Sequence, residues 1–413
     1  MAKIRGGKRF FRIGRVDIDD VAYNYGEGAS GYSSATVTGA GFDMRFFQVS
    51  EGNFSLGASP TVEEQPVLRG TVGVHYAEKT GINVAGDIGV LMHPETIRWF
   101  LDAGLLRNAN GELFEHTIQE FYPGIDASEK GATYHGCKVS QIAGSWGSGN
   151  NKATITTSWQ GQREEAYTGT LPTVVPWPTT KAGYFFTLSG LIDLSTSGVT
   201  LPVCDYSEVS FQVANNLAEG PRCFDADATL RGAISDLIAG QERITGSFSL
   251  QWRDLSALTL LRNFTTAKMR NIFIHPTSDT SLTVSGAETA GSSVVVEVSA
   301  NPTTLLAVGD VVAFQHKSGG ATTTNWSTGV VTARATGPNT VTIETLDINL
   351  SAGDVIWTEA LEIRFNSINI NKLDKQGGPD DSVIVMQGGF QGKADSSGAQ
   401  VTYRAKGTVL PLT

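Results

Sequence analysis

The sequence predicts a mainly β protein of antiparallel strands, with two similar segments in tandem and a small β unit inserted in the second. Three observations predict this fold class. Apolar and polar residues alternate along many segments, helix signals are few and short, and one strand-then-helix pattern occurs twice. The length of 413 residues suits two or three domains of ordinary size.

The alternation has the period of strands with one buried face. It is clear in three segments, around Val209, Phe211 and Val213, around Leu361, Ile363 and Phe365, and around Val341 and Ile343. Polar residues separate these apolar ones, so successive side chains point to core and solvent in turn. The pattern favours antiparallel sheets.

The clearest helix signal lies between His93 and Gly104. Pro94 suits a first helical position, Glu95 suits the positive end of the helix dipole, and Gly104 suits the position just past the end. We therefore expect one short helix here, with Ile97, Phe100 and Leu101 facing the core.

This strand-then-helix pattern has a second copy. Val84–Val90 and the helix after it resemble Ile244–Leu250 followed by a helix at Asp254–Leu261, so that Gly86 matches Gly246, an offset of 160.

A later strand pair repeats as well. Val139–Ile142 resembles Phe365–Ile368, and Trp159–Gly161 resembles Phe390–Gly392, an offset of 231 for the second match. The two offsets, 160 and 231, differ by 71 residues, which predicts an insertion of about that size in the second copy.

The insertion is expected at Asp279–Trp357, where strands and Gly, Asn or Pro turns alternate as in a small barrel or sandwich. Pro172, Pro176 and Pro178 mark a stiff connector between the copies. The expected organisation is an extended arm at 1–55, a first unit at 56–168, a Pro-rich linker at 169–180, a second unit at 181–278 and 358–413, and the inserted β domain at 279–357.

Charge and cysteine content argue against several classes of function and site. The formal net charge is -10, with 41 Asp and Glu against 31 Lys and Arg, which argues against a protein that holds nucleic acid by neutralising phosphates. Three scattered cysteines, Cys137, Cys204 and Cys223, indicate neither a disulfide framework nor a zinc cluster. We expect neither a signal peptide nor a membrane span, because no long apolar stretch is present.

Short matches to catalytic and cofactor-binding motifs occur, but the neighbouring sequence lacks the elements that these motifs require. The stretch from Gly26 to Gly31 fits G-x-G-x-x-G, but no apolar strand precedes it and no helix is expected after it. His135 and Cys137 lack further metal ligands nearby. Adjacent carboxylates such as Glu164 and Glu165 point to opposite faces of a strand. We therefore expect no enzyme activity, no cofactor and no metal.

Several segments resemble the major tail tube proteins of bacteriophages with long, non-contractile tails. The resemblance is carried by Glu63–Gly70, Val84–Val90 with its short helix, Tyr134–Val139, and the hairpin that closes at Trp159–Gly161. It covers the chain from about residue 50 to the end, apart from the insertion.

The resemblance implies a fold, an assembly and partners. Each unit would be a tube-type antiparallel β sandwich or barrel with one helix, and six units would form a ring around a channel for duplex DNA. Two units per chain then imply homotrimeric rings stacked into a tube. The partners would be the chain itself and the tape measure, tail terminator and tail tip proteins. DNA would pass without specific binding and no membrane would be involved. The chain would assemble in the host bacterial cytoplasm and reside in the virion tail.

Candidate subunit contacts come from exposed aromatics. Phe10, Phe11, Phe46 and Phe47 lie in the expected arm, where they either contact a neighbouring subunit or cover their own core. Trp146 lies in an expected hairpin loop at Ala143–Asn151, a second candidate for contacts between rings. The alternative function is a secreted or surface β-rich carbohydrate-binding protein, which should carry a signal peptide and a platform of exposed aromatics.

Overall fold

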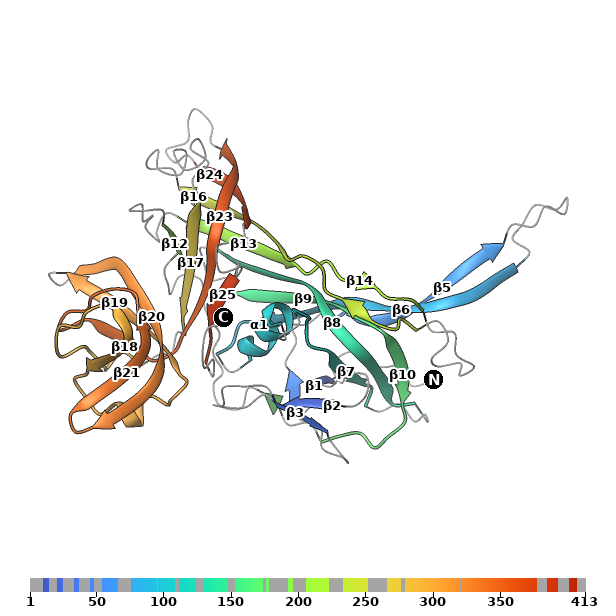
Figure 1. Cartoon of the computed structure of the whole chain (residues 1–413), viewed down its shortest axis with the longest axis horizontal. Helices are drawn as coiled ribbons and strands as arrows, with labels where there is room; N and C mark the ends of the chain where they lie inside the picture. Colours follow the sequence, from blue (N-terminus) through green and yellow to red (C-terminus); the bar gives the residue numbers. More distant parts are fainter. Residues whose placement is uncertain are drawn as a thin grey trace.

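The chain folds as a mainly antiparallel β protein in a computed structural model (Figure 1). The structure describes residues 10–14, 21–24, 33–36, 45–47, 54–65, 76–94, 96–107, 111–123, 129–147, 153–173, 176–177, 192–195, 206–222, 233–251, 266–275, 279–318, 321–376, 385–392 and 401–406. All statements below concern these residues.

The first half of the chain contains strands and one helix. They are β1 (Phe10–Gly14), β2 (Val21–Asn24), β3 (Ser33–Thr36), β4 (Arg45–Phe47), β5 (Gly57–Gln65), β6 (Tyr76–Leu91), β7 (His116–Phe121), β8 (Gly131–Gly147), β9 (Thr154–Gly161), β10 (Arg163–Tyr167) and β11 (Pro176–Trp177), with α1 (Ile97–Leu105) after β6.

The second half consists of strands in the described residues, apart from one short 3-10 turn. The strands are β12 (Ile192–Ser195), β13 (Tyr206–Ala214), β14 (Ala218–Glu219), β15 (Leu237–Ile238), β16 (Arg243–Gln251), β17 (Ala267–Ile274), β18 (Gly291–Glu297), β19 (Val311–Ser318), β20 (Ala321–Thr336), β21 (Asn339–Leu346), β22 (Val355–Trp357), β23 (Ala360–Gln376), β24 (Val385–Gly392) and β25 (Val401–Arg404).

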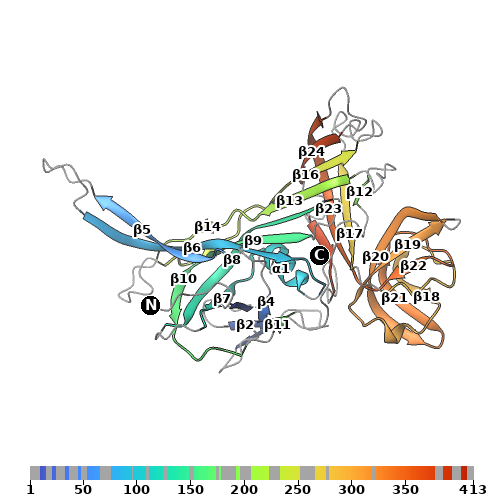
Figure 2. The same ribbon diagram turned by 180° about the vertical axis from the view of Figure 1, so that it is seen from behind.

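Sixteen strands join into one sheet, in which β8 is the branching strand. On one side β8 pairs with β9 and β10, and on the other with β7 and β13. From β13 the sheet continues through β16, β24 and β23 to β17 and β12, while β9 leads through β6 to β5. Figures 1 and 2 show β5 and β6 extending as a long hairpin away from the body of the chain.

The helix forms close to the predicted position. α1 begins after Thr96 and runs through Gly104, which had been expected just past its end. Gly104 instead packs closely against β8, since a Cβ on it would lie 3.2 Å from the Cβ of Ile142. The second expected helix, Asp254–Leu261, lies outside the described residues.

Two strand pairs hold the glycines that the sequence comparison matched. Gly86 lies opposite Trp159 in the β6·β9 pair, and Gly246 lies opposite Phe390 in the β16·β24 pair. Both pairs are antiparallel, and each places an aromatic residue across from a glycine.

The irregularities of the neighbouring strands also correspond. In β8 a bulge follows Val139, which lies opposite Trp159, and in β23 a bulge follows Ile370, which lies opposite Phe390. This register pairs Val139 with Ile370, whereas the sequence comparison matched Val139 with Phe365. The two alignments differ by five residues, because both segments alternate with period two and a pattern of apolar residues alone does not fix the alignment.

The Asp279–Trp357 segment forms a sheet of its own, in the order β18-β21-β20-β19-β22, with a separate apolar core that includes Val296, Phe314 and Ile343. Its strand β21 contains Val341 and Ile343, where the alternation predicted a strand. The chain segments that lead into and out of this unit lie side by side, since the amide of His275 donates to the carbonyl of Glu359 at 3.1 Å. The unit lies at one end of the molecule, opposite the β5–β6 hairpin (Figure 1).

The expected arm is partly integrated into the large sheet. β1 pairs with β7, and Phe11 and Ile13 are buried. β11, from the Pro-rich linker, pairs with β4 at the outer end of the sheet, where a proline does not interrupt the ladder.

Candidate assembly surfaces

The junction between the two halves of the large sheet is the pairing of β8 with β13. Val209 lies opposite Trp146, Phe211 opposite Gly144 and Val213 opposite Ile142, so the buried face is continuous across the junction. Because each pair places apolar groups on the same face, the two halves share one core.

Trp146 anchors this junction. Its side chain is 3% exposed and meets the ring of Phe273 edge to face at 4.9 Å between centroids, with the Phe211 ring at 5.5 Å. The segment expected as a hairpin loop from Ala143 to Asn151 is therefore strand as far as Gly147, since Ile142, Gly144 and Trp146 continue the buried alternation of β8.

A buried amide links the halves a second time. The side chain of Asn215, fully buried just after β13, donates to the carbonyls of Gly104 and Val139, at 2.9 Å each. Its oxygen accepts from Arg107 at 3.1 Å. One residue of the second half thus fixes α1 against β8 in the first.

The opposite face of this junction is polar, and the exposed carboxylate Glu208 lies on it at the end of the β8·β13 ladder. A shallow groove on this face has no charged lining residue; it is lined by Phe211 and by hydroxyl, amide and small residues, namely Ala143, Gly144, Ser145, Thr154, Thr156, Ser210, Gln212, Thr245, Gly246 and Ser247. Along the groove itself, phosphates would meet neither cations that bind them nor carboxylates that repel them.

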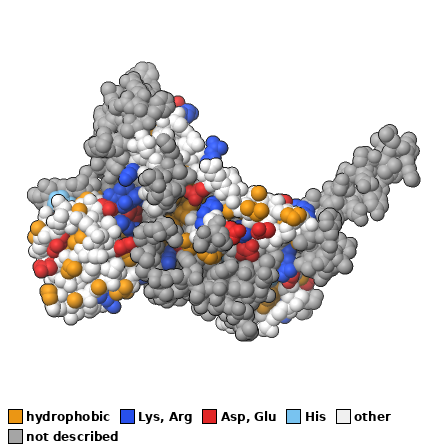
Figure 3. Space-filling view, in the orientation of Figure 1, with side chains coloured by type: hydrophobic (Ala, Val, Ile, Leu, Met, Phe, Trp, Pro, Cys, Tyr) orange, Lys and Arg blue, Asp and Glu red, His pale blue; other side chains and the backbone are white. Residues whose placement is uncertain are grey.

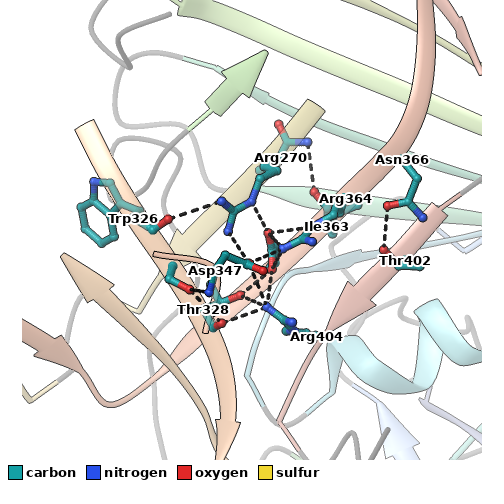
Figure 4. A network of polar contacts seen from close by, with 12 residues as sticks. Arg270, Trp326, Thr328, Asp347, Ile363, Arg364, Asn366, Thr402 and Arg404 are labelled. Atoms are coloured by element: carbon teal, nitrogen blue, oxygen red, sulfur yellow. Dashed lines mark hydrogen bonds and ion pairs between the residues drawn. The ribbon is translucent and has the colours of Figure 1, made fainter. Parts of the chain in front are cut away.

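A charged cluster joins the inserted unit to the large sheet (Figure 4). Glu362 of β23, with a side chain 2% exposed, accepts from Arg270 at 2.7 Å and from Arg364 at 3.0 Å, and it pairs with Arg404 at 3.3 Å. The inserted unit contributes Thr328, whose hydroxyl donates to Glu362, and Asp347, which accepts from Arg364 at 2.7 Å.

The electrostatics of this cluster favour ionised Glu362. Burial alone would raise the pKa of Glu362, but the guanidinium groups of Arg270, Arg364 and Arg404 and the Thr328 hydroxyl hold it well below its usual range. Burial would lower the pKa of Arg364, yet Glu362 and Asp347 raise it above the ordinary value. Glu362 and Arg364 therefore both remain ionised at neutral pH.

An apolar patch lies beside the charged cluster. Ile272 and Ile274 of β17 pack with Val311, Trp326 and Val330 of the inserted unit. The inserted unit is thus held to the sheet by both apolar and ionic contacts, which favours a fixed orientation.

The charged cluster around Glu362 is not predictable from the sequence. Glu362 and Arg364 are two apart on a strand whose other face holds Leu361, Ile363 and Phe365, so both were expected on a solvent face. The inserted unit covers that face, and alternation within one strand carries no signal of a covering domain.

The aromatic candidates for subunit contacts lie largely inside the chain. Phe11 is 8% exposed and stacks on Phe54 at 4.2 Å, and Phe10 stacks on Phe121 at 5.0 Å. Trp146 is part of the core, as described above. Phe46 and Phe47 belong to β4, paired with β1 and β11, and their side chains lie outside the described residues. A role of any of these five in subunit contact stays a prediction.

Side chains that could bind a metal or act as nucleophiles are few in the part of the chain that the structure describes. No cluster there of three or more His, Cys, Asp or Glu could hold a metal ion. Burial raises the pKa of the Cys137 thiol, so it stays protonated. The described helix is too short to cross a membrane. In Figure 3 acidic and basic side chains are interspersed over the described surface.

Comparison with known proteins gives one family. A search of curated proteins found no match to the chain. A family model described as phage tail tube protein matches residues 21–304, more than half of the chain, in agreement with the mainly antiparallel β fold. The chain belongs to the phage tail tube protein family.

Proposed function

We propose that the chain is the tube subunit of a long, non-contractile phage tail, with two tube-type units per chain and three chains per ring. Rings stack into a tube through which DNA passes. The family match supports a structural role in a tail tube. Assembly from the host cytoplasm, and contacts with tape measure, terminator and tip proteins, belong to the same proposal.

The observation that carries the proposal is the shared register of two strand sets. In the first set β5-β6-β9-β8-β7-β1 follow one another, and in the second β13-β16-β24-β23-β17-β12 do. The bulges agree as well, between His116 and Ile118 in β7 and between Ala267 and Met269 in β17. A duplicated unit accounts for each of these agreements. It also extends the first unit to include β1, the counterpart of β12.

The pairing of β8 with β13 supports ring formation. It joins one unit to the next through strand pairing, and repeating the same operation leads around a ring that leaves no sheet edge open. With two units in each chain, a ring of six units takes three chains.

The polar face of the sheet, opposite the apolar core, is the proposed wall of the channel. α1 packs on the other face, against β8 and β9, and this thicker layer fits the larger outer circumference (Figure 1). The wall would include Ser145, Ser210, Gln212 and Ser247 in the uncharged groove, and the acidic Glu208 on the same face. A wall in which hydroxyl and amide groups predominate would let DNA slide without binding.

Electron microscopy of the purified full-length chain tests this proposal. Hollow tubes or closed rings are expected. A protein that remains monomeric at high concentration and in the presence of a tail-tip nucleus would contradict it.

The carbohydrate-binding alternative predicts exposed aromatic rings. Among the described residues, the large hydrophobic side chains that are exposed are Ile238, Val295 and Val308, and none is aromatic. A glycan-binding assay on the same preparation separates the two functions.

A further inference from the structure

Two strand edges of the large sheet have no strand partner among the described residues. β5 pairs with β6 on one side only. β23 pairs with β24 as far as Gln376, but with β17 only as far as Ile368, which leaves the other side of Asn369–Gln376 open. Open edges of this kind form hydrogen bonds with another strand when one is available.

The counterparts of these two edges pair with each other inside the chain. By position in the sheet, β13 is the counterpart of β5 and β8 is the counterpart of β23. The C-terminal half of β8, Gln141–Gly147, pairs with Glu208–Ala214 of β13. The half of β23 that corresponds to this segment is the half that is open.

The registers of the two strand sets fix which residues correspond. Val139 and Ile370 both precede the bulge and lie opposite the matched aromatics, so Ile142 corresponds to Leu373. On the other strand, Gly57 lies opposite Ala85 in β6 and Gln212 lies opposite Thr245 in β16. Since Gly86 corresponds to Gly246, Ala58 corresponds to Val213.

We infer that β5 of one chain pairs antiparallel with the C-terminal half of β23 of a second copy of the chain, with Ala58 opposite Leu373. This register sets Ser59 opposite Lys372, Gly57 opposite Asp374 and Ser55 opposite Gln376. It repeats between chains the pairing of Val213 with Ile142 within the chain. The inference rests on the proposed function only in that the partner is a neighbouring subunit of the ring.

The faces of the two strands agree with this register. Ala58 and Leu373 both pack against the large core, as Val213 and Ile142 do. Ser59, Lys372 and Asp374 are exposed, so they would share the polar face. A slip of one residue would set Leu373 across from an exposed residue, on the wrong face.

The ends of the two ladders agree too. Within the chain the β8·β13 ladder stops at Ala214, the counterpart of Ser59. The residue after Ser59 is Pro60, which has no amide hydrogen to extend the ladder. Lys372 and Asp374, which form an ion pair at 2.5 Å in the isolated chain, are charges typical of an edge kept from unspecific pairing.

Cysteine cross-linking of the full-length chain tests the register. Cys204 and Cys223 are first replaced by Ser, while the buried Cys137 is kept. Two double variants then place cysteines across the inferred interface, Ser59→Cys with Lys372→Cys and Ala58→Cys with Leu373→Cys. Neighbouring antiparallel positions alternate between wide and narrow spacing, so one of the two pairs has the separation that a disulfide needs.

Three controls accompany these variants. Gln141→Cys with Ala214→Cys and Ile142→Cys with Val213→Cys are the matched pairs within one chain, and one of these two variants should form an internal disulfide without a change in mass on a non-reducing gel. Ser59→Cys with Leu373→Cys places the two cysteines on opposite faces of the sheet, so this variant should give no cross-linked species. Mixing the single variants Ser59→Cys and Lys372→Cys should give covalent dimers only.

The expected result is a covalent trimer from at least one of the two registered pairs, reversed by reduction. Rings or tubes seen by electron microscopy without a cross-link in either pair would overturn the inferred register while leaving the proposed function intact. Absence of any ring or tube, from the parent chain as well, would overturn both.

Discussion

Gly246 lies directly opposite Phe390 in the β16·β24 pair, and the ring of Phe390 occupies the space that a Cβ on residue 246 would fill, with its Cζ only 2.1 Å from that position. Two residues along, Phe248 lies over Gly388 in the same way, at 2.2 Å. Each aromatic ring of this pair of strands thus covers a glycine of the other strand.

This contact predicts a paired mutational effect. Gly246→Ala should lower the free energy of unfolding by about 1–3 kcal/mol, because the added methyl overpacks the ring. Phe390→Ala should cost about 3–5 kcal/mol. The double variant should cost less than the sum, since removal of the ring relieves its overlap with the methyl and leaves only the Ser210 carbonyl oxygen, 2.6 Å from the new Cβ, in close contact. Chemical denaturation measures all three. Gly286→Ala, where the nearest atoms would be 3.8 Å from the new Cβ, is the control. Additive costs would contradict the packing argument.

Asn215 predicts a link between the two halves of the sheet. Asn215→Ala leaves the buried carbonyls of Gly104 and Val139 without their donor, which should cost about 1–3 kcal/mol. Faster hydrogen exchange of the α1 amides should accompany the loss. Gln212→Ala, which removes an exposed hydrogen bond to Gln141, should cost less and leave α1 protected. Equal effects of the two variants would contradict the assigned role.

Glu362 predicts a pH dependence for the attachment of the inserted unit. Its pKa is lower in the folded chain than in the unfolded chain, so its contribution is fully present above the unfolded value of about 4.3 and is lost as pH falls below it. Glu362→Gln should lower the stability at pH 7 by about 3–5 kcal/mol, because three arginines lose a buried partner. It should also flatten the fall in stability between about pH 5 and pH 2.

The same substitution in an exposed ion pair is the control for Glu362. Glu219→Gln removes the 3.0 Å contact with Arg222 at the surface and should change the stability by less than about 1 kcal/mol. Thermal unfolding of both variants as a function of pH makes the comparison. A Glu362→Gln variant with the pH profile of the parent chain would rule out the ionised carboxylate as the source of the effect.

The inserted unit is predicted to be dispensable for assembly. Because Asp279 and Thr358 exchange hydrogen bonds at 3.0 and 3.2 Å, a short turn can replace the segment between the two ends. The deletion exposes Ile272 and Ile274, so Ile274→Thr is added to keep the variant soluble. Electron microscopy should still reveal tubes, with less density outside. A variant that folds but forms no tubes would contradict dispensability.

The sequence predicted the local features that depend on the period of apolar residues. The buried faces around Phe211, Ile363 and Ile343 follow from alternation, and the helix follows from Ile97, Phe100 and Leu101. Features that depend on another part of the chain were not predictable. Trp146 was assigned to a loop because nothing near it in sequence announces β13 or Phe273 as its cover. The correspondence of Val139 with Ile370 depends on a strand register that period two leaves open.

The central claim is that two equivalent units in one chain let three chains form a six-unit ring. A three-dimensional reconstruction of the assembled full-length chain by electron cryo-microscopy tests it most directly, by the number of chains in each ring. The account predicts three chains, with the regions around Gly86 and Gly246 alternating at six similar positions around the channel. A ring of six chains, or a ring in which these two regions occupy unlike positions, would contradict it.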